Sequence, residues 1–285
     1  MTIRGYYEGN FDEDGRLTES SMEWVRSKEL MSRALPRPPA RVADVAGGTG
    51  PYALWLAEMG YQVSLLDLVP SHVAQAQRKA NAAGVVVDCV EGDARALPWA
   101  DDTFDVVLVM GALYHLQDRD DRLACLREAQ RVLKPGGALV ASYISRWASL
   151  FDGYRYGFVA DGRFAAILDE DLSSGRHENA FDHPLWFTSS YFHTPDEIRE
   201  ELASVEFEGI QVLPVEGFTS VTGVPEDFRT EVGMAQLLTH LRATETEPAL
   251  IGVSSHLISL SRKAAEPPVS MHSSAAIGVG RWCPL

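Results

Sequence analysis

The sequence has few cysteines and no long apolar run. Its three cysteines, Cys89, Cys125 and Cys283, lie far apart and form no CxxC pair, so neither a disulfide framework nor a cysteine-ligated metal site is expected. No apolar stretch is long enough to cross a bilayer, and the first residues lack the basic start and apolar centre of a secretory signal. These absences predict a reduced, cytoplasmic protein without a membrane partner.

Basic side chains are also scarce. The 285 residues include 25 lysines and arginines against 40 aspartates and glutamates, a net charge of −15, and no basic run interrupts this balance. Sequence-independent binding of nucleic acid depends on neutralising phosphates with basic side chains. We therefore expect no nucleic acid partner.

One cluster of potential metal ligands stands out in the stretch "HENAFDHP". It contains His177, Glu178, Asp182 and His183. Their spacing matches no standard ligand motif, and mixed polar residues of this kind are common in solvated loops. The sequence therefore predicts no metal site.

Short apolar runs alternate with amphipathic segments through the first half of the chain. Strand-like runs are expected at residues 41–46, 62–69, 85–94, 103–113 and 138–144, and helices at 51–61, 70–84 and 120–133, the last closed by "KPGG". Such alternation implies right-handed crossovers and a parallel sheet covered on both faces. The fold class is therefore α/β, with a doubly wound sheet.

The stretch "VADVAGGTG" (residues 42–50) places Gly47, Gly48 and Gly50 in the first strand-to-helix turn. In doubly wound sheets, ligands bind beyond the carboxyl ends of the strands, and glycine lets the backbone approach them closely. Asp67 ends the second strand, where an acid typically accepts hydrogen bonds from the hydroxyls of a ribose. The turn and the acid together predict a nucleoside ligand.

The pattern D-x-A-x-G-x-G from Asp44 to Gly50 differs from the dinucleotide fingerprint G-x-G-x-x-G. It resembles the first motif of class I S-adenosylmethionine-dependent methyltransferases of the bacterial, small-molecule type. "LLDLVP", "EGDARALPWADDTFDVVLVMGALYHL" and "RVLKPGGALVASY" resemble the family's later motifs, in order. One departure is Ala46, where the family has glycine, and this puts cofactor affinity in question.

The resemblance implies a seven-stranded, mostly parallel, Rossmann-like sheet. Residues 208–218 and 249–263 would supply its closing antiparallel hairpin, joined through a helix. The implied cofactor is S-adenosylmethionine, which leaves as S-adenosylhomocysteine. Asp67 would hold the ribose and Asp93 the adenine amino group. The implied cofactor-binding residues are Asp44, Ala46, Gly47, Gly48, Gly50, Asp67, Leu68, Asp93, Ala94, Met110 and Tyr114, with Tyr7 and Arg26 added from the amino-terminal segment.

Residues 146–195 are unusually aromatic and are expected to form an inserted helical lid over the methyl acceptor. They hold 11 of the 26 phenylalanines, tyrosines and tryptophans, and small-molecule pockets are lined mainly by such groups. A small satellite core would account for over half of these aromatics. Thr194 and Glu197 are expected to cap the following helix. The expected substrate-binding residues are Tyr6, Tyr114, Trp186, Tyr191 and His193, although simple packing of Tyr6 remains an alternative.

Histidines near the carboxyl ends of the strands are candidates for a general base. His115 and His183 are the expected catalytic residues. A purely structural role for His115, shaping the cofactor loop, remains an alternative.

The predicted organisation is an amino-terminal lid helix region (1–37), a methyltransferase core (38–145 and 196–263), the acceptor lid (146–195) and a flexible tail (264–285). A monomer or a homodimer is expected. The predicted activity is methylation of a small organic acceptor, such as a secondary metabolite, on oxygen, nitrogen or carbon. The alternatives are a tRNA or protein methyltransferase and a non-catalytic adenosylmethionine-binding module.

Overall fold

The computed structural model describes residues 21–228 and 230–265, and the structural statements below concern these residues alone. The predictions for Tyr6, Tyr7 and most of the carboxy-terminal tail fall outside them. No helix in the described ranges is both long and apolar enough to span a membrane.

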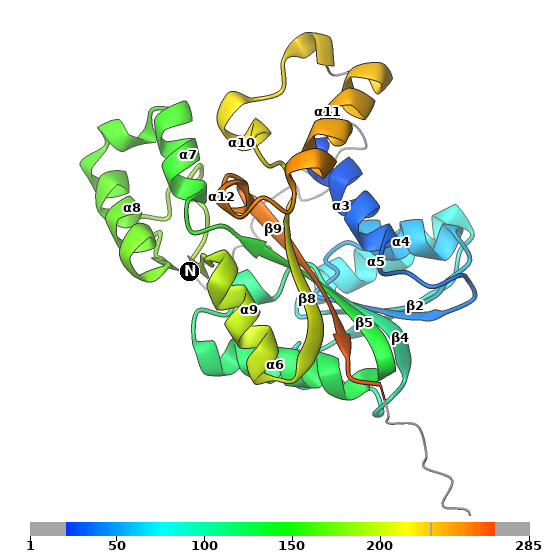
Figure 1. Cartoon of the computed structure of the whole chain (residues 1–285). Helices are drawn as coiled ribbons and strands as arrows, with labels where there is room; N and C mark the ends of the chain where they lie inside the picture. The colour runs from blue at the N-terminus through cyan, green and yellow to red at the C-terminus, as the bar shows by residue number, and fades with distance from the viewer. Residues whose placement is uncertain (1–20, 229, 266–285) are drawn as a thin grey trace, which may run out of the picture.

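A seven-stranded sheet forms the centre of the described residues, in the order β3-β2-β1-β4-β5-β9-β8. Strands β1 to β5 pair in parallel, and β9 runs antiparallel to both of its neighbours. This confirms the predicted Rossmann-like sheet (Figure 1). The strands are β1 (Arg41–Val45), β2 (Gln62–Asp67), β3 (Val87–Glu91), β4 (Phe104–Val109), β5 (Leu133–Ile144), β8 (Phe207–Pro214) and β9 (His256–Lys263).

Helices cover both faces of the sheet. On one face α3 (Met22–Ser32), α4 (Pro51–Glu58) and α5 (Pro70–Ala83) bury Leu30, Leu56 and Ala80 against the strands. The opposite face is covered by α6 (Arg119–Val132) and α9 (Pro195–Ser204). The prolines that begin α4 and α5 occupy a position where the missing N–H costs no hydrogen bond.

The "KPGG" stretch differs from its prediction as a helix end. Helix α6 stops at Val132, and Leu133 already pairs with Phe104 as the first residue of β5. The pairing register then shifts before Val106, so that "KPGG" forms an irregularity within the strand. Gly136 has a φ of +77° there, a left-handed conformation that glycine adopts without strain.

Residues 146–195 form an insertion with its own small core. It contains α7 (Ala148–Arg155), α8 (Gly162–Ser174), a short 3-10 turn (Phe158–Ala160) and the two-residue strands β6 (Arg176–His177) and β7 (Ser190–Tyr191). Figure 1 shows α7 and α8, in green, to one side of the sheet. The insertion's ends lie together, because Ser145 and His193 form a parallel bridge. The predicted Thr194–Glu197 capping box begins α9.

A second helical segment connects β8 to β9. It contains α10 (Thr219–Thr222), a 3-10 turn (Glu226–Phe228), α11 (Glu231–Thr244) and α12 (Pro248–Ile251). Leu237 and Leu241 of α11 pack against Met22 of α3. This contact fixes α3 beside the edge of the sheet where the strands end (Figure 1).

Candidate active site

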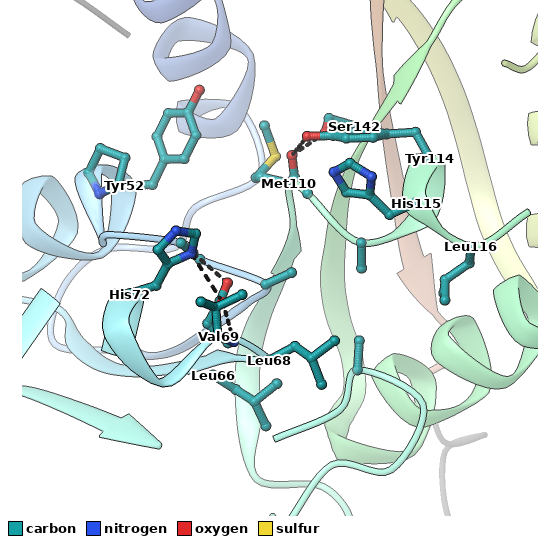
Figure 2. A pocket seen from close by; sticks show the side chains of 18 of the residues that line it. Tyr52, Leu66, Leu68, Val69, His72, Met110, Tyr114, His115, Leu116 and Ser142 are labelled. Atoms are coloured by element: carbon teal, nitrogen blue, oxygen red, sulfur yellow. Dashed lines mark hydrogen bonds and ion pairs between the residues drawn. The ribbon is translucent and has the colours of Figure 1, made fainter. Parts of the chain in front are cut away.

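A cavity opens at the carboxyl ends of β1, β2 and β4, the edge where ligands bind in doubly wound sheets. We call it the sheet-edge cavity. Figure 2 shows Tyr52, Val69 and His72 on one side of it, and Tyr114, His115 and Ser142 on the other. Its lining includes the predicted residues Ala46, Gly47, Gly48, Asp67, Leu68, Asp93, Ala94, Met110, Tyr114 and His115.

The glycine turn forms the floor of this cavity, and its three glycines have different roles. A Cβ at Gly47 would lie 2.7 Å from Oδ2 of Asp44, so there is no room for a side chain. Gly48 has a φ of +57°, and a Cβ there would meet no protein atom within 4 Å. Gly50, with a φ of +85°, is the residue just before α4. It lies against Ala76 of α5 and does not line the cavity. Gly48 is therefore the glycine that leaves space open.

Ala46 occupies the position where the related motif has glycine. Its φ of 57° is left-handed, which costs a residue with a side chain about 1–2 kcal/mol. Gly111 makes room for it, because a Cβ on Gly111 would lie only 2.9 Å from the Ala46 carbonyl oxygen. The departure is therefore accommodated by strain at Ala46 and by a glycine on the next loop.

Asp67 connects the turn to the second strand. Its Oδ2 accepts a hydrogen bond from the Gly48 N–H at 2.9 Å, and its Oδ1 accepts one from the Val69 N–H at 2.9 Å. Nδ1 of His72 lies 3.3 Å from Oδ1. Each carboxylate oxygen has two lone pairs, so Asp67 can hold the turn and still accept hydrogen bonds from ligand hydroxyls.

Asp44 is fully buried beneath the turn, and neither of its carboxylate oxygens makes a hydrogen bond of good geometry with the described residues. Burial, with the nearby charge of Asp67, raises the pKa of Asp44 to about 7, and the backbone N–H of Ala53 offsets this only in part. An uncompensated carboxylate next to a cavity favours a positively charged ligand, which would stabilise its ionised form.

The raised pKa of Asp44 gives a prediction about pH. Because the folded protein holds this proton up to about pH 7, stability without ligand should fall as pH rises from about 4 to 7. A cationic ligand favours the carboxylate, so its affinity should rise roughly tenfold from about pH 6 to 8 and its binding should release a proton. Titration calorimetry in buffers of different ionisation heat measures the affinity and the proton release. Asp44→Asn should remove the pH dependence and the proton release, and an unchanged pH dependence in this variant would contradict the assignment.

The opposite wall comes from β4, β5 and the turn after β4. Ser142 Oγ donates to the Met110 carbonyl at 2.5 Å, and the Tyr114 hydroxyl lies 3.4 Å from the same oxygen (Figure 2). Further round, Asp93 is paired with Arg95 at 2.6 Å, and this hydrogen bond lowers the pKa of Asp93. Asp93, which follows β3, thus adds an ionised carboxylate to the cavity lining, beside the apolar and aromatic groups of this wall.

A second cavity lies between the insertion and the sheet, and we call it the insertion cavity. Its lining is mainly apolar and rich in aromatic residues, with Phe158, Phe164, Trp186, Phe187 and Phe192, and it also includes Asp152, His177 and His256. His256, the first residue of β9, also lines the sheet-edge cavity. The ring of Phe187 stacks on that of His115, with centroids 5.8 Å apart. The two cavities are therefore neighbours that meet at His256.

His256 is held by a carboxylate. Its Nδ1 lies 2.6 Å from Oε1 of Glu216, whose other oxygen accepts the His256 backbone N–H at 3.0 Å. Burial raises the pKa of Glu216, but the charge and hydrogen bonds of His256 outweigh it and keep that pKa below its ordinary value. Glu23 of α3 brings a third ligand atom within 4.8 Å of these two residues. Since Glu216 and His256 already bind each other, we assign no cation to this group.

Besides Asp44 and Gly50, four predicted site residues line neither cavity. Arg26 is fully buried and pairs with Glu29 and Glu245, so it joins α3 to the end of α11, and its predicted contact with the cofactor stays a prediction. Tyr191 lies under the Arg122 guanidinium, 3.7 Å from its ring centre, and lines neither cavity.

The other two are histidines. His193 is completely buried near Glu201, and burial lowers its pKa. His193 lines neither cavity, and its predicted substrate contact stays a prediction. His183 also lines neither cavity, because its ring stacks on Trp186 at 4.1 Å. Of the predicted acceptor residues, Tyr114 lines the sheet-edge cavity and Trp186 the insertion cavity.

Several lining residues were not predicted from the sequence. Glu23 and Ser27 of α3 line the sheet-edge cavity about one turn apart, whereas Arg26 does not line it. His72 could have been found, because it follows Asp67 closely at the start of α5. No sequence signal marks Glu216 and His256, which meet only because β8 and β9 are adjacent.

Comparison with known proteins shows what this site resembles. Residues 43–141 match the family described as "Methyltransferase domain". The chain is 39% identical over 123 residues to a demethylmenaquinone methyltransferase of Thermus thermophilus, covering 42% of this chain and 54% of that protein. It is 36% identical over 132 residues to the ubiquinone/menaquinone biosynthesis C-methyltransferase UbiE of Roseobacter denitrificans, covering 45% of this chain and 48% of that protein. The chain thus spans about half the length of these curated relatives.

Solved structures share the fold over a longer stretch. A SAM-dependent methyltransferase of Methanosarcina mazei superposes with a TM-score of 0.58 at 19% identity, over 83% of this chain and 98% of that one. A possible histamine N-methyltransferase of Thermotoga maritima gives 0.56 at 18% identity, over 91% and 99%. The family match thus places a methyltransferase domain at residues 43–141, and the solved structures share the fold of this chain.

Proposed function

We propose that the protein methylates a small hydroxylated aromatic acceptor of the hydroquinone type, on a ring carbon, with S-adenosylmethionine as donor. The relatives named above carry menaquinone or ubiquinone biosynthesis in their names, and one is called a C-methyltransferase. Their similarity spans less than half of this chain, so the acceptor must be argued from the site itself. The observation that carries the proposal is an aromatic cavity directly beside the sheet-edge cavity.

The sheet-edge cavity fits the cofactor. The open space at Gly48 suits its aminoacid part, Asp67 its ribose hydroxyls, and the uncompensated Asp44 its positive charge. When bound, S-adenosylmethionine supplies a methyl group on a positively charged sulfur, open to direct displacement. The protein's own task is then to align the acceptor, exclude water and remove a proton.

The insertion cavity suits a planar ring. Trp186, only 3% exposed, packs with Phe164 and lines the cavity together with Phe187. Burying a ring against these groups contributes about 2 kcal/mol from apolar area alone. Because Phe187 also stacks on His115, an acceptor beside Phe187 would lie next to the sheet-edge cavity. The insertion acts in this proposal as the acceptor lid.

Alanine at Trp186 or Phe187 should therefore raise the acceptor's KM roughly tenfold. The affinity for S-adenosylmethionine should stay within about a factor of three, since neither residue lines the sheet-edge cavity. Tyr154→Ala is a matched control, because Tyr154 belongs to the same insertion but is 71% exposed. Steady-state kinetics and calorimetric titration give both quantities. Equal loss of cofactor and acceptor affinity would show that the insertion only supports folding.

The proposed activity is tested with a reduced naphthoquinone that lacks a ring methyl. Incubation with the protein and S-adenosylmethionine should give S-adenosylhomocysteine and a product heavier by one methylene unit. Fragmentation of the product in a mass spectrometer locates the new methyl on carbon or on oxygen. Methylation of oxygen would leave the activity in place but contradict the C-methylation proposed here.

A further inference from the structure

His256 occupies the junction between the two cavities. Among residues 21–228 and 230–265 it is the one residue common to their linings, so it borders both the space assigned to the cofactor and the space assigned to the acceptor. Its side chain is 29% exposed, which leaves it accessible to a ligand. A group that handles the proton of an acceptor during methyl transfer must stand at this boundary.

The histidine ring has a fixed orientation. Glu216 accepts from Nδ1 at 2.6 Å through one carboxylate oxygen, and the other oxygen is held by the His256 N–H and lies 3.0 Å from Ser254 Oγ. Ser254 is itself fully buried. A carboxylate bound to Nδ1 selects the tautomer with its proton on Nδ1 and the lone pair on Nε2. Nε2 is therefore the proton-accepting nitrogen.

The surroundings of His256 are acidic on several sides. Glu216 lies after β8, Glu23 comes from α3, and Asp152 of α7 interacts electrostatically with the ring. Arg155 of α7 brings positive charge near Asp152, with which it also interacts electrostatically. Negative charge around an imidazole stabilises the imidazolium that forms when the ring takes up a proton.

We propose that His256 is the general base that removes the hydroxyl proton of the acceptor, and that Glu216 is its positioning residue. This inference rests on the proposed function, because it needs a hydroxylated acceptor in the insertion cavity. In the step, the acceptor O–H bond breaks and an Nε2–H bond forms. The electron pair stays on the acceptor oxygen and is delocalised into the ring, which makes a ring carbon nucleophilic. After this carbon takes the methyl group from sulfur, it loses its ring hydrogen as a proton to solvent, and the imidazolium returns its own proton to the acceptor oxygen, which restores the hydroxylated ring.

His115 is the competing candidate for the base. It lines only the sheet-edge cavity and packs between the rings of Tyr114 and Phe187. By contrast, His256 lines both cavities and is held by a carboxylate at 2.6 Å, which stabilises the protonated ring. This difference favours His256 as the group that removes the proton. His115 would instead pack between the cofactor and the acceptor.

Proton removal can be tested without methyl transfer. Nitrophenol, added to the protein below the pH at which it ionises in water, should show the visible absorption of its phenolate when bound to the natural chain. The absorption should disappear in His256→Ala and in His256→Gln, and persist in His240→Ala, which alters an exposed histidine on α11. Phenolate formation that is equal with and without His256, or absent from the natural chain, would overturn the proposal.

Turnover of a naphthohydroquinone provides the second readout. His256→Ala should lower kcat about a hundredfold or more, with the acceptor's KM and the cofactor affinity within about a factor of three. Added imidazole should restore part of the lost turnover. In Glu216→Gln the imidazolium loses support, so the acidic limb of the kcat profile should move to lower pH.

The two readouts separate the inference from the proposed function. If the natural chain ionises nitrophenol through His256 but does not methylate naphthohydroquinone, the acceptor class is wrong and the base assignment stands. An unchanged pH profile and kcat in His256→Ala would overturn the assignment while the methyltransferase activity remains. Loss of the natural chain's turnover on treatment with a chelator would also overturn it, because Glu23, Glu216 and His256 would then hold a cation.

Discussion

Replacing Gly48 with valine should abolish measurable binding of S-adenosylmethionine. The residue has a φ of +57°, and a Cβ there would have no atom of the described residues within 4 Å. This is the space assigned to the aminoacid part of the cofactor, so a branched side chain would exclude it. The left-handed backbone costs a side chain about 1–2 kcal/mol, so the thermal midpoint without ligand should fall only modestly. Calorimetric titration and thermal unfolding measure the two effects.

Gly84→Val is the matched control for backbone strain. Gly84 ends α5 with a φ of +69°, and a Cβ there also meets nothing within 4 Å. Gly84 does not line the sheet-edge cavity. Its valine variant should therefore show a similar loss of stability and keep its cofactor affinity. Normal binding by Gly48→Val, or equal loss of binding in both variants, would refute the role of Gly48.

Asp67→Ala should lower cofactor affinity at least about tenfold. Hydrogen bonds to a charged group are worth roughly 1.5–3 kcal/mol each, and the variant loses those to the ribose hydroxyls. It also releases the Gly48 N–H, which Asp67 holds at 2.9 Å, so the turn itself loses support. Asp67→Asn keeps one acceptor oxygen and should lose less. Calorimetric titration measures the affinities, and an unchanged affinity in the alanine variant would mean that the ribose is held elsewhere.

The sheet and the glycine turn were predictable because their signals are local. Five apolar runs, with helical segments after the first, second and fourth, specify a parallel sheet without knowledge of any distant contact. In the same way, glycines directly after the first strand and an acid after the second mark the ligand edge. Gly47, Gly48 and Asp67 accordingly lie together at the sheet-edge cavity.

The surroundings that the sequence could not predict are those of residues with a distant partner. Arg26 has the charge needed to bind a carboxylate, but in the structure it pairs with Glu245, more than two hundred positions later. His193 looked accessible in an aromatic segment, but the bridge between Ser145 and His193 carries it into the core. Only the pairing of β8 with β9 brings His256 to Glu216. Residue type alone could not distinguish these cases.

The measurement that tests the account most directly uses S-adenosylmethionine with a deuterated methyl group and a naphthohydroquinone lacking a ring methyl. We expect S-adenosylhomocysteine and methylated product to appear in equal amounts. The transferred methyl group should keep all of its deuterium and should be bonded to a ring carbon. The Gly48→Val and Asp67→Ala variants should give little or no product. Binding of the cofactor without formation of S-adenosylhomocysteine, across reduced quinones and other hydroxylated aromatics, would contradict the account and favour a non-catalytic adenosylmethionine-binding protein.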